Sequence, residues 1–188
     1  MQNLAGKKIA ILSTKGFEQA ELTEPKRQFA EAGAEVTVIA PEKGSIRGWD
    51  ETDWGDDVEA TMGLDEARAE DFDALVLPGG QINPDLLRVE PRAIRLIQSF
   101  HDLGKTIGAI CHAPWLLIEA GIVKGRTATC YRSIRTDLRN AGASVVDETV
   151  VADAGIVTSR NPGDLDAFCA KIAEEILEGR HDRRPVAA

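Results

Sequence analysis

Cysteine and histidine are both scarce in this sequence, with three of each among 188 residues. Cys111, Cys130 and Cys169 are odd in number and widely spaced, which predicts no disulfide framework and fits a reducing compartment. The histidines lie far from one another and show neither Cys-x-x-Cys nor His-x-x-x-His spacing. We therefore expect neither a dedicated metal site nor a bound cofactor.

Long apolar runs and clusters of positive charge are also missing. No segment approaches the ~18 consecutive apolar residues of a membrane-spanning helix, and residues 1–6 lack the apolar core of a signal peptide. The formal net charge is −9, and only Arg180–Arg184 is rich in basic residues. We expect no nucleic-acid partner, no membrane partner and a cytoplasmic location.

Hydrophobic residues make up 43% of the chain and charged residues 28%, values typical of a globular domain. Apolar runs alternate with amphipathic segments, which predicts a mostly parallel sheet with helices on both faces. We expect one domain over 1–188, with a core of about 7–178 and a frayed tail at 180–188. The expected strands of the main sheet are Lys8–Ser13, Glu35–Ala40, Ala74–Leu77, Thr106–Ile110 and Ile156–Ser159, and the expected long helices are Glu18–Ala32, Pro91–Leu103 and Gly163–Glu178.

Between these elements the sequence is less regular. Pro25 lies inside the first helical segment and predicts a kink or a short first turn there. The other expected elements are a hairpin or two edge strands at Ile46–Trp49 and Val58–Met62, a short helix at Leu64–Glu70, strands at Thr127–Cys130 and Val145–Ala152, and a helix at Ser133–Ala141.

The segment Lys105–Ala120 changes at Cys111 from a buried-strand pattern to an amphipathic helical pattern, with the small residues Gly108, Ala109 and Ala113 around the change. A sharp strand-to-helix turn with small neighbours is typical of a nucleophile elbow, here with cysteine in the usual place of serine. A sulfur at a helix N-terminus is favoured as a thiolate by the partial positive charge and free N–H groups there. The alternative is a cysteine that is buried only for packing.

Two other strand ends carry residues suited to the same site, because ligands of open α/β sheets bind outside the carboxyl ends of the strands. Gly79 and Gly80 follow one strand, where their backbone N–H groups can face a developing oxyanion or simply form a turn. Glu18 lies after the loop that follows the first strand. Neither of the nucleotide-binding glycine motifs is present, so a nucleotide site is not supported.

His112 follows the cysteine directly and can act as the base or the counter-charge for a thiolate. A third group should orient this histidine, as in other catalytic triads. The candidate acids are Asp85, Glu18 and Glu21, each of which can equally serve a helix dipole in a first turn.

Several motifs together resemble the ThiJ/PfpI superfamily, and within it the branch of PfpI-like intracellular proteases. The resemblance runs from about Lys8 to Leu177. The motifs are Gly16–Glu18, Glu21–Pro25, Asp71–Gly80, Ala109–Pro114 and Ser159–Leu165.

The resemblance implies a flavodoxin-like three-layer α/β sandwich, with Cys111 as the nucleophile and His112 beside it. It also implies a protonated glutamate that donates to the sulfur, and Glu18 matches that position. The oxyanion donors would be the backbone N–H groups of Gly80 and His112. Tyr131 matches a tyrosine near the family's pocket.

The resemblance further implies a triad completed across a subunit boundary. In PfpI-like members the acid that follows the Gly-Gly turn comes from a second subunit. The matching residue is Asp85, where the family usually has glutamate on a loop one residue shorter. We expect a homodimer, or a hexamer built of dimers, in which Asp85 reaches the neighbouring site.

The leading hypothesis for function is cysteine-nucleophile chemistry in stress protection. The activities of the family are peptidase, glutathione-independent glyoxalase and deglycase acting on small carbonyl compounds or their protein adducts, and the sequence does not separate them. One alternative is a non-enzymatic oxidation sensor that uses Cys111. Another is a glutamine amidotransferase, which needs a late His-x-Glu pair, whereas the only late histidine is His181.

Overall fold

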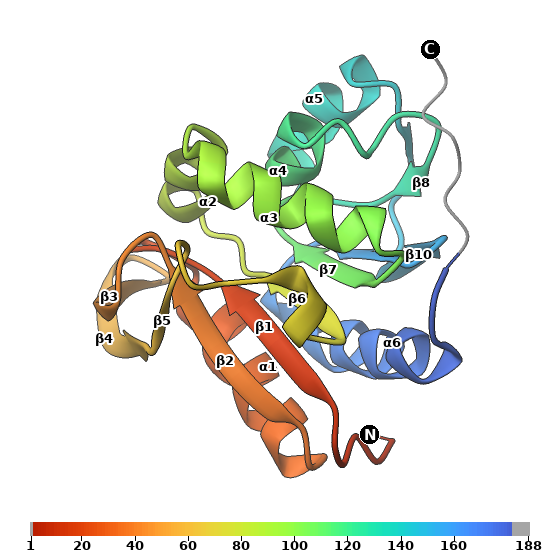
Figure 1. Ribbon diagram of the computed structural model, residues 1–188. Coiled ribbons are helices and arrows are strands. Elements are labelled where there is room, and N and C mark those ends of the chain that lie inside the picture. The colour runs from red at the N-terminus through yellow and green to blue at the C-terminus, as the bar shows by residue number, and fades with distance from the viewer. Residues whose placement is uncertain (1, 182–188) are drawn as a thin grey trace.

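The central element of the computed structural model, which describes residues 2–181, is a seven-stranded sheet with the strand order β10-β11-β7-β6-β1-β2-β5 (Figure 1). All neighbouring strands are parallel except β10 and β11. The expectation of a mostly parallel sheet is therefore confirmed. The strands are β1 (Lys8–Leu12), β2 (Glu35–Ala40), β5 (Met62–Gly63), β6 (Ala74–Leu77), β7 (Thr106–Ile110), β10 (Val150–Asp153) and β11 (Ile156–Ser159).

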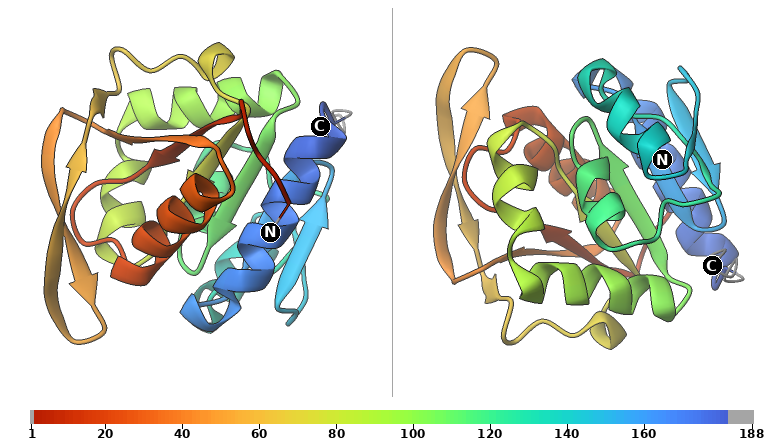
Figure 2. Two further views of the ribbon diagram at one scale, coloured as in Figure 1. Left: turned by 90° about the horizontal axis from the view of Figure 1, so that it is seen from below. Right: turned by 90° about the horizontal axis from the view of Figure 1, so that it is seen from above.

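Helices cover both faces of this sheet, as Figure 2 shows. One face carries α1 (Gln19–Glu31) and α6 (Leu165–Glu178), which also contact each other. The other face carries α3 (Pro91–Asp102) and α4 (Pro114–Glu119), and α2 (Ile82–Arg88) packs on both of them. The three layers confirm the flavodoxin-like sandwich. The smaller elements are α5 (Arg135–Asn140), the two-stranded sheet of β8 (Thr127–Ala128) and β9 (Ser144–Val145), and the 3₁₀ turns Ala69–Asp71, Arg132–Ile134 and Pro162–Asp164.

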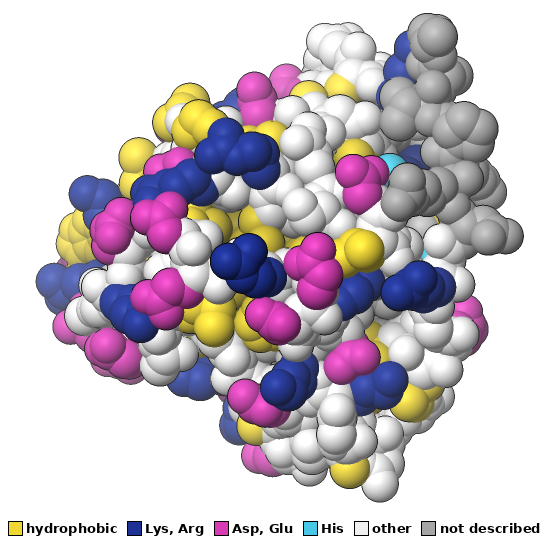
Figure 3. Space-filling view, viewed as in Figure 1, with side chains coloured by type: hydrophobic (Ala, Val, Ile, Leu, Met, Phe, Trp, Pro, Cys, Tyr) yellow, Lys and Arg dark blue, Asp and Glu magenta, His cyan; other side chains and the backbone are white. Residues whose placement is uncertain are grey.

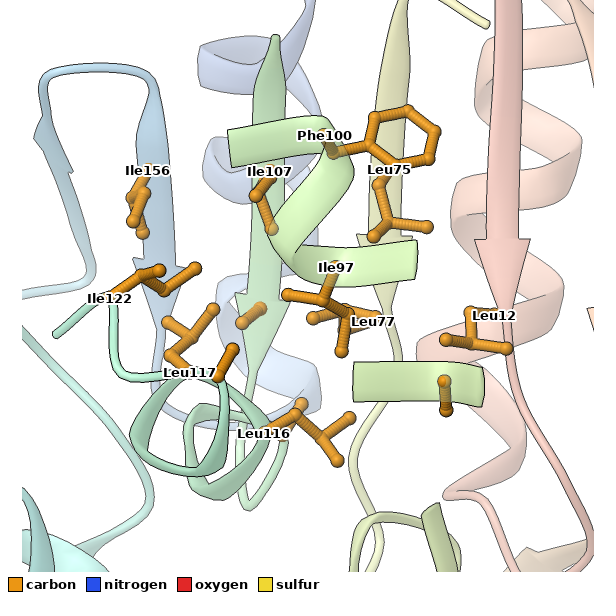
Figure 4. Close-up of a cluster of buried hydrophobic side chains, with 14 of the residues drawn as sticks. Leu12, Leu75, Leu77, Ile97, Phe100, Ile107, Leu116, Leu117, Ile122 and Ile156 are labelled. Atoms are coloured by element: carbon orange, nitrogen blue, oxygen red, sulfur yellow. The ribbon is translucent and has the colours of Figure 1, made fainter. Parts of the chain in front are cut away.

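The core consists of two apolar clusters, one on each side of the sheet. In β6, Leu75 and Leu77 belong to the cluster under α3 and α4, whereas Ala74 and Val76 belong to the cluster under α1 and α6. Figure 4 shows Phe100 of α3 beside Leu75. Because successive strand residues point to opposite faces, a continuous apolar run is what a strand covered on both sides requires.

The sequence missed α2. Its seven residues include Pro84 and follow Gly79 and Gly80 closely, so the segment resembles a loop. Tertiary contacts hold it in place: Asn83 accepts from the backbone N–H of Thr14 at 2.8 Å and donates to the Pro78 carbonyl at 2.8 Å. A buried amide with both ends bonded fixes the start of this helix more firmly than local propensity does.

Three other expectations need correction. The helix expected at Leu64–Glu70 is absent, and only the 3₁₀ turn Ala69–Asp71 forms there. The strand expected at Val145–Ala152 is divided between β9 and β10, because its first part pairs with β8 outside the main sheet. The helix α1 runs through Pro25 without interruption. The expected frayed tail lies outside the described residues from position 182 onward.

The expected hairpin forms as β3 (Gly44–Asp50) and β4 (Asp53–Ala60), apart from the main sheet (Figure 1). The backbone N–H of Trp49 donates to the Phe17 carbonyl at 2.7 Å, and Trp49 forms a parallel bridge with Glu18. The hairpin is thereby attached to the loop that follows β1. Within residues 2–181, no helix is both long and apolar enough to cross a lipid bilayer.

The core under α3 yields a stability prediction. Phe100 is fully buried against Phe72 and the sheet. Phe100→Ala should lower the free energy of unfolding by about 3–5 kcal/mol, because it leaves a cavity that the rigid sheet cannot fill. Leu177→Ala, at a side chain that is 46% exposed, should change it by less than about 0.5 kcal/mol. Urea unfolding followed by circular dichroism measures both, and equal losses would contradict this account of the core.

Candidate active site

A cavity of about 650 Å³ lies at the carboxyl ends of three central strands. Gly16 follows β1, Gly80 follows β6 and Cys111 follows β7, and all three line this cavity. From β1 the chain continues to β2, which pairs with one edge of β1, and it later returns to form β6, which pairs with the other edge. Such a switch point opens a crevice between the loops, which is where α/β sheets bind ligands.

Cys111 occupies a strained turn between β7 and α4. Its φ is +63°, which is rare for a residue with a side chain. The strain is held by two backbone hydrogen bonds, from Cys111 N–H to the Ser159 carbonyl at 3.1 Å and from Tyr131 N–H to the Cys111 carbonyl at 2.9 Å. This is the geometry of a nucleophile elbow, in which the reactive side chain projects into the cavity.

The carboxyl group against the sulfur belongs to Glu21 and not to Glu18, which corrects the expectation from the sequence. Glu21 is fully buried, its Oε2 accepts from the backbone N–H of Gly79 at 2.8 Å, and the carboxyl interacts with the Cys111 thiol. Burial raises the pKa of Glu21 to about 8, so this carboxyl is protonated at neutral pH. The N–H of Gly79 is used by this bond, which leaves Gly80 as the glycine that faces the cavity.

Glu18 lies at the mouth of the cavity and is half-buried. Its carboxylate accepts a hydrogen bond from the backbone N–H of Glu51 in the hairpin turn, and burial raises its pKa. The two glutamates differ because Glu18 precedes α1, whereas Glu21 lies on the buried face of that helix with Leu22 and Pro25. An acid on the apolar face of a helix was the signal in the sequence that marked Glu21.

The thiol of Cys111 is not predisposed to ionise. Burial raises its pKa above the ordinary value, and ionisation of Glu21 above its own pKa of about 8 raises it further. The backbone N–H groups of Gly80 and His112 hydrogen-bond to the sulfur and act in the opposite direction. These N–H groups favour the thiolate, but burial outweighs them, so the resting cysteine keeps its proton.

His112 contacts the sulfur and is held on three sides. Its Nδ1 lies 3.2 Å from Cys111 Sγ, and its Nε2 lies 3.0 Å from Ser133 Oγ. The ring stacks on Tyr131 at 4.7 Å between centroids and meets the edge of Trp115 at 5.3 Å. Burial lowers the pKa of His112, so the imidazole is neutral and able to accept a proton. An imidazole that accepts at Nδ1 carries its own hydrogen at Nε2, where Ser133 Oγ accepts it.

The sequence profile of the DJ-1/PfpI family matches residues 7–175. The chain belongs to the DJ-1/PfpI family. It is 47% identical over 165 residues to general stress protein 18 of Bacillus subtilis, an alignment covering 87% of this chain and 94% of that protein. It is 42% identical over 161 residues to deglycase PfpI of Pyrococcus furiosus, covering 86% and 94%. The crystal structure of DJ-1beta from Drosophila melanogaster matches with a TM-score of 0.81 at 30% identity, covering 95% of both chains.

Asp85 does not reach His112 within this DJ-1/PfpI chain. It lies exposed on α2, and its side chain has no hydrogen bond or ion pair with any of residues 2–181. The group that orients His112 within the chain is Ser133, which the sequence did not identify. Serine is common on surfaces and no motif surrounds it, so the contact is visible only in the folded chain, where Ser133 lies in the 3₁₀ turn Arg132–Ile134.

His181 lies at the other end of the sheet from Cys111. Its backbone N–H donates to the carbonyl of Gly104, which precedes β7. This location removes the basis for a glutamine amidotransferase. Glu175, Glu178 and His181 each bring one possible metal-ligand atom within 4.8 Å of the others, but this group takes no part in the cavity.

The buried acid yields a prediction for stability against pH. The folded protein keeps a proton on Glu21 up to a pKa of about 8, whereas an unfolded carboxyl releases it near the ordinary pKa of 4.5. The free energy of unfolding should therefore fall as pH rises from about 5 to about 8, by at most about 1.4 kcal/mol per unit. The Glu21→Gln variant has no proton to release at this position, so its free energy of unfolding should lack this dependence on pH. Urea unfolding of both proteins at several pH values tests it, and a difference between them that stays constant with pH would contradict it.

Proposed function

We propose that this protein is an enzyme that attacks small carbonyl compounds, or their adducts on proteins, through Cys111. The observation that carries the proposal is the contact of Cys111 Sγ with His112 Nδ1 at 3.2 Å, next to two backbone N–H groups. A nucleophile, a neutral base and paired donors in one cavity are what carbonyl addition requires.

The chemistry follows from these distances. His112 Nδ1 takes the thiol proton as the sulfur adds to the carbonyl carbon, and the N–H groups of Gly80 and His112 face the oxygen that becomes negative. For methylglyoxal, a proton then moves from the former aldehyde carbon to the neighbouring carbon, which gives a lactoyl thioester. Water hydrolyses this thioester to lactate and restores the thiol, so no redox cofactor is consumed.

The names of the relatives support a deglycase or stress-protection role. The matched proteins include deglycase PfpI of Pyrococcus furiosus, protein/nucleic acid deglycase 2 of Escherichia coli and general stress protein 18 of Bacillus subtilis. A putative cysteine protease of Bacillus subtilis is 44% identical. We favour small carbonyl substrates over peptides because the cavity volume suits a small molecule.

A second candidate function is oxidation sensing at the same cysteine. The buried carboxyl of Glu21 and the two N–H groups surround the sulfur and would hold a sulfinate. The raised pKa of the thiol argues for slow oxidation. Mass spectrometry after mild peroxide treatment tests this role, and equal oxidation of Cys111, Cys130 and Cys169 would exclude a tuned sensor.

We further propose a homodimer, alone or within a hexamer, in which Asp85 reaches the His112 of the neighbouring subunit. Asp85 is one turn along α2 from Ile82, which lines the cavity. Exposed apolar side chains surround it on α2 and at its C-cap: Ile82, Leu86 and Val89, at spacings typical of one helical face. Figure 3 shows hydrophobic side chains at the surface over α2, in the upper left of the view. A second copy of the chain covering this face would bury these side chains and bring Asp85 to the cavity of the neighbouring subunit.

The nucleophile is tested with lactate formation from methylglyoxal. Cys111→Ser should lose activity by about a thousandfold or more, because the serine hydroxyl is a far weaker nucleophile with the same base. Cys169→Ala, in the core under α6, removes a different buried thiol and should retain turnover. An active Cys111→Ser protein would overturn the proposed function.

The shared site is tested by complementation. Asp85→Asn should lose at least about tenfold in activity, because the amide cannot stabilise the imidazolium. A purified heterodimer of Asp85→Asn with Cys111→Ser should recover about half of the wild-type activity, since one of its two sites is complete. A heterodimer no more active than the mean of its parents, or an active monomer by size-exclusion chromatography, would contradict the role of Asp85.

A further inference from the structure

One wall of the cavity mouth comes from the β3–β4 hairpin and not from the main sheet. Trp49 and Glu51 of this hairpin line the cavity. The turn is held in position: Trp49 Nε1 donates to the Glu51 carbonyl at 3.0 Å, and the Glu51 N–H donates to the Glu18 carboxylate. Glu51 has a φ of +52°, so the turn keeps a conformation that a free loop would avoid. The side chain of Glu51 is therefore presented at the mouth by a fixed backbone.

The charge at this mouth is of one sign. The acidic residues that line the cavity are Glu18, Glu51 and the protonated Glu21, and no lysine or arginine of residues 2–181 lines it. The hairpin carries one cation, Arg47, whose guanidinium donates to the Gly55 carbonyl and lies over the Trp54 ring. The hairpin's acidic residues are Asp50, Glu51, Asp53, Asp56, Asp57 and Glu59.

One cation of the neighbouring loops, Arg160, is already neutralised. Arg160, two residues before the lining residue Pro162, forms ion pairs with Asp147 at 3.0 Å and with Asp164 at 2.8 Å. Carboxylates that converge on a partly enclosed cavity produce a negative potential there, since low-dielectric walls focus the field. The raised pKa of Glu18, to which the charges of Asp50 and Glu51 contribute after burial, agrees with that potential.

We propose that the cavity mouth is a binding site for the cationic part of the substrate, an ammonium or guanidinium group attached to the reacting carbonyl adduct, with Glu51 as the specificity-determining residue. This inference rests on the proposed function and narrows it to the class of substrate. Adducts on lysine-like or arginine-like side chains fit the site. Neutral aldehydes are accepted but gain no attraction from Glu51, and anionic carbonyl acids are disfavoured.

A cation at the mouth also promotes the first chemical step. Burial opposes loss of the proton from Cys111. The carboxylates at the mouth add a negative potential that opposes it further. A positive group of the substrate near Glu51 offsets that negative potential as it binds. The thiol is thereby activated by the substrate that carries the charge, and stays protonated and less reactive without it.

The charge preference is measured on Cys111 without turnover, using methanethiosulfonates with a trimethylammonium, a neutral methyl or a sulfonate group. Each reagent forms a mixed disulfide with the sulfur and releases methanesulfinate. The rate at which each reagent modifies the protein is divided by its rate with 2-mercaptoethanol, which corrects for its intrinsic reactivity. Mass spectrometry identifies the cysteine that is modified. The cationic reagent should exceed the anionic one by about tenfold or more at low salt, and the ratio should decline as salt rises.

Three variants decide which carboxylate sets this ratio. Glu51→Gln should lower it by about threefold or more, and Glu51→Lys should lower it further or invert it, because both remove the charge at the mouth. Glu59→Gln removes the same charge from the far end of the hairpin, where Glu59 pairs with Ser45, and should leave the ratio close to that of the wild type. A wild-type ratio near one, or equal effects of Glu51→Gln and Glu59→Gln, would overturn the inference.

Turnover separates this inference from the proposed function. Hemithioacetals of methylglyoxal with thiocholine, 2-mercaptoethanol and 3-mercaptopropionate share one reacting centre and differ in charge. We expect kcat/KM to decline from the cationic to the anionic adduct, and Glu51→Gln to flatten that order. Equal turnover of all three would overturn the inference and leave the proposed function standing. Turnover of none, with the labelling preference intact, would overturn the proposed function.

Discussion

The site depends on the hydrogen bond from the Gly79 N–H to the Glu21 carboxyl, 2.8 Å long and buried behind Cys111. A Cβ at Gly79 would lie 2.6 Å from the Cys111 Cβ and 2.7 Å from Glu21 Oε2, so only glycine allows the strand end, the acid and the sulfur to meet. A buried acid without such a partner would cost several kcal/mol. The bond therefore secures Glu21 against the sulfur and leaves Gly80 and His112 to supply the N–H groups that face it.

The electrostatic state of the resting site follows from that burial. The acid is protonated, the imidazole is neutral and the thiol keeps its proton, because ions are costly where water is excluded. Carboxylates remain charged only toward the mouth, on the side of the hairpin. A substrate that carries its own positive charge meets these carboxylates first and then a thiol whose ionisation it favours.

Two groups compete to orient His112. Ser133 occupies its Nε2 within the chain at 3.0 Å, and the proposed partner's acid would approach the same nitrogen. A hydroxyl fixes the tautomer and the direction of the ring but adds no charge, whereas a carboxylate also stabilises the imidazolium. Both groups can contribute if Ser133 sets the orientation of the imidazole within one chain and the acid of the second subunit supplies the negative charge in the dimer.

The sequence by itself determined the layers, the main strands and the elbow. Apolar runs such as Ala74–Leu77, the small residues around Cys111 and the adjacent His112 are local patterns whose structure depends on near neighbours. Tertiary structure decided what long-range contacts control. It selected Glu21 over Glu18, because burial depends on how α1 faces the sheet. It formed α2 around the bonds of Asn83, brought Ser133 to His112 and brought Glu51 to the cavity. Those residues lie far apart along the chain, and only the folded sheet makes them neighbours.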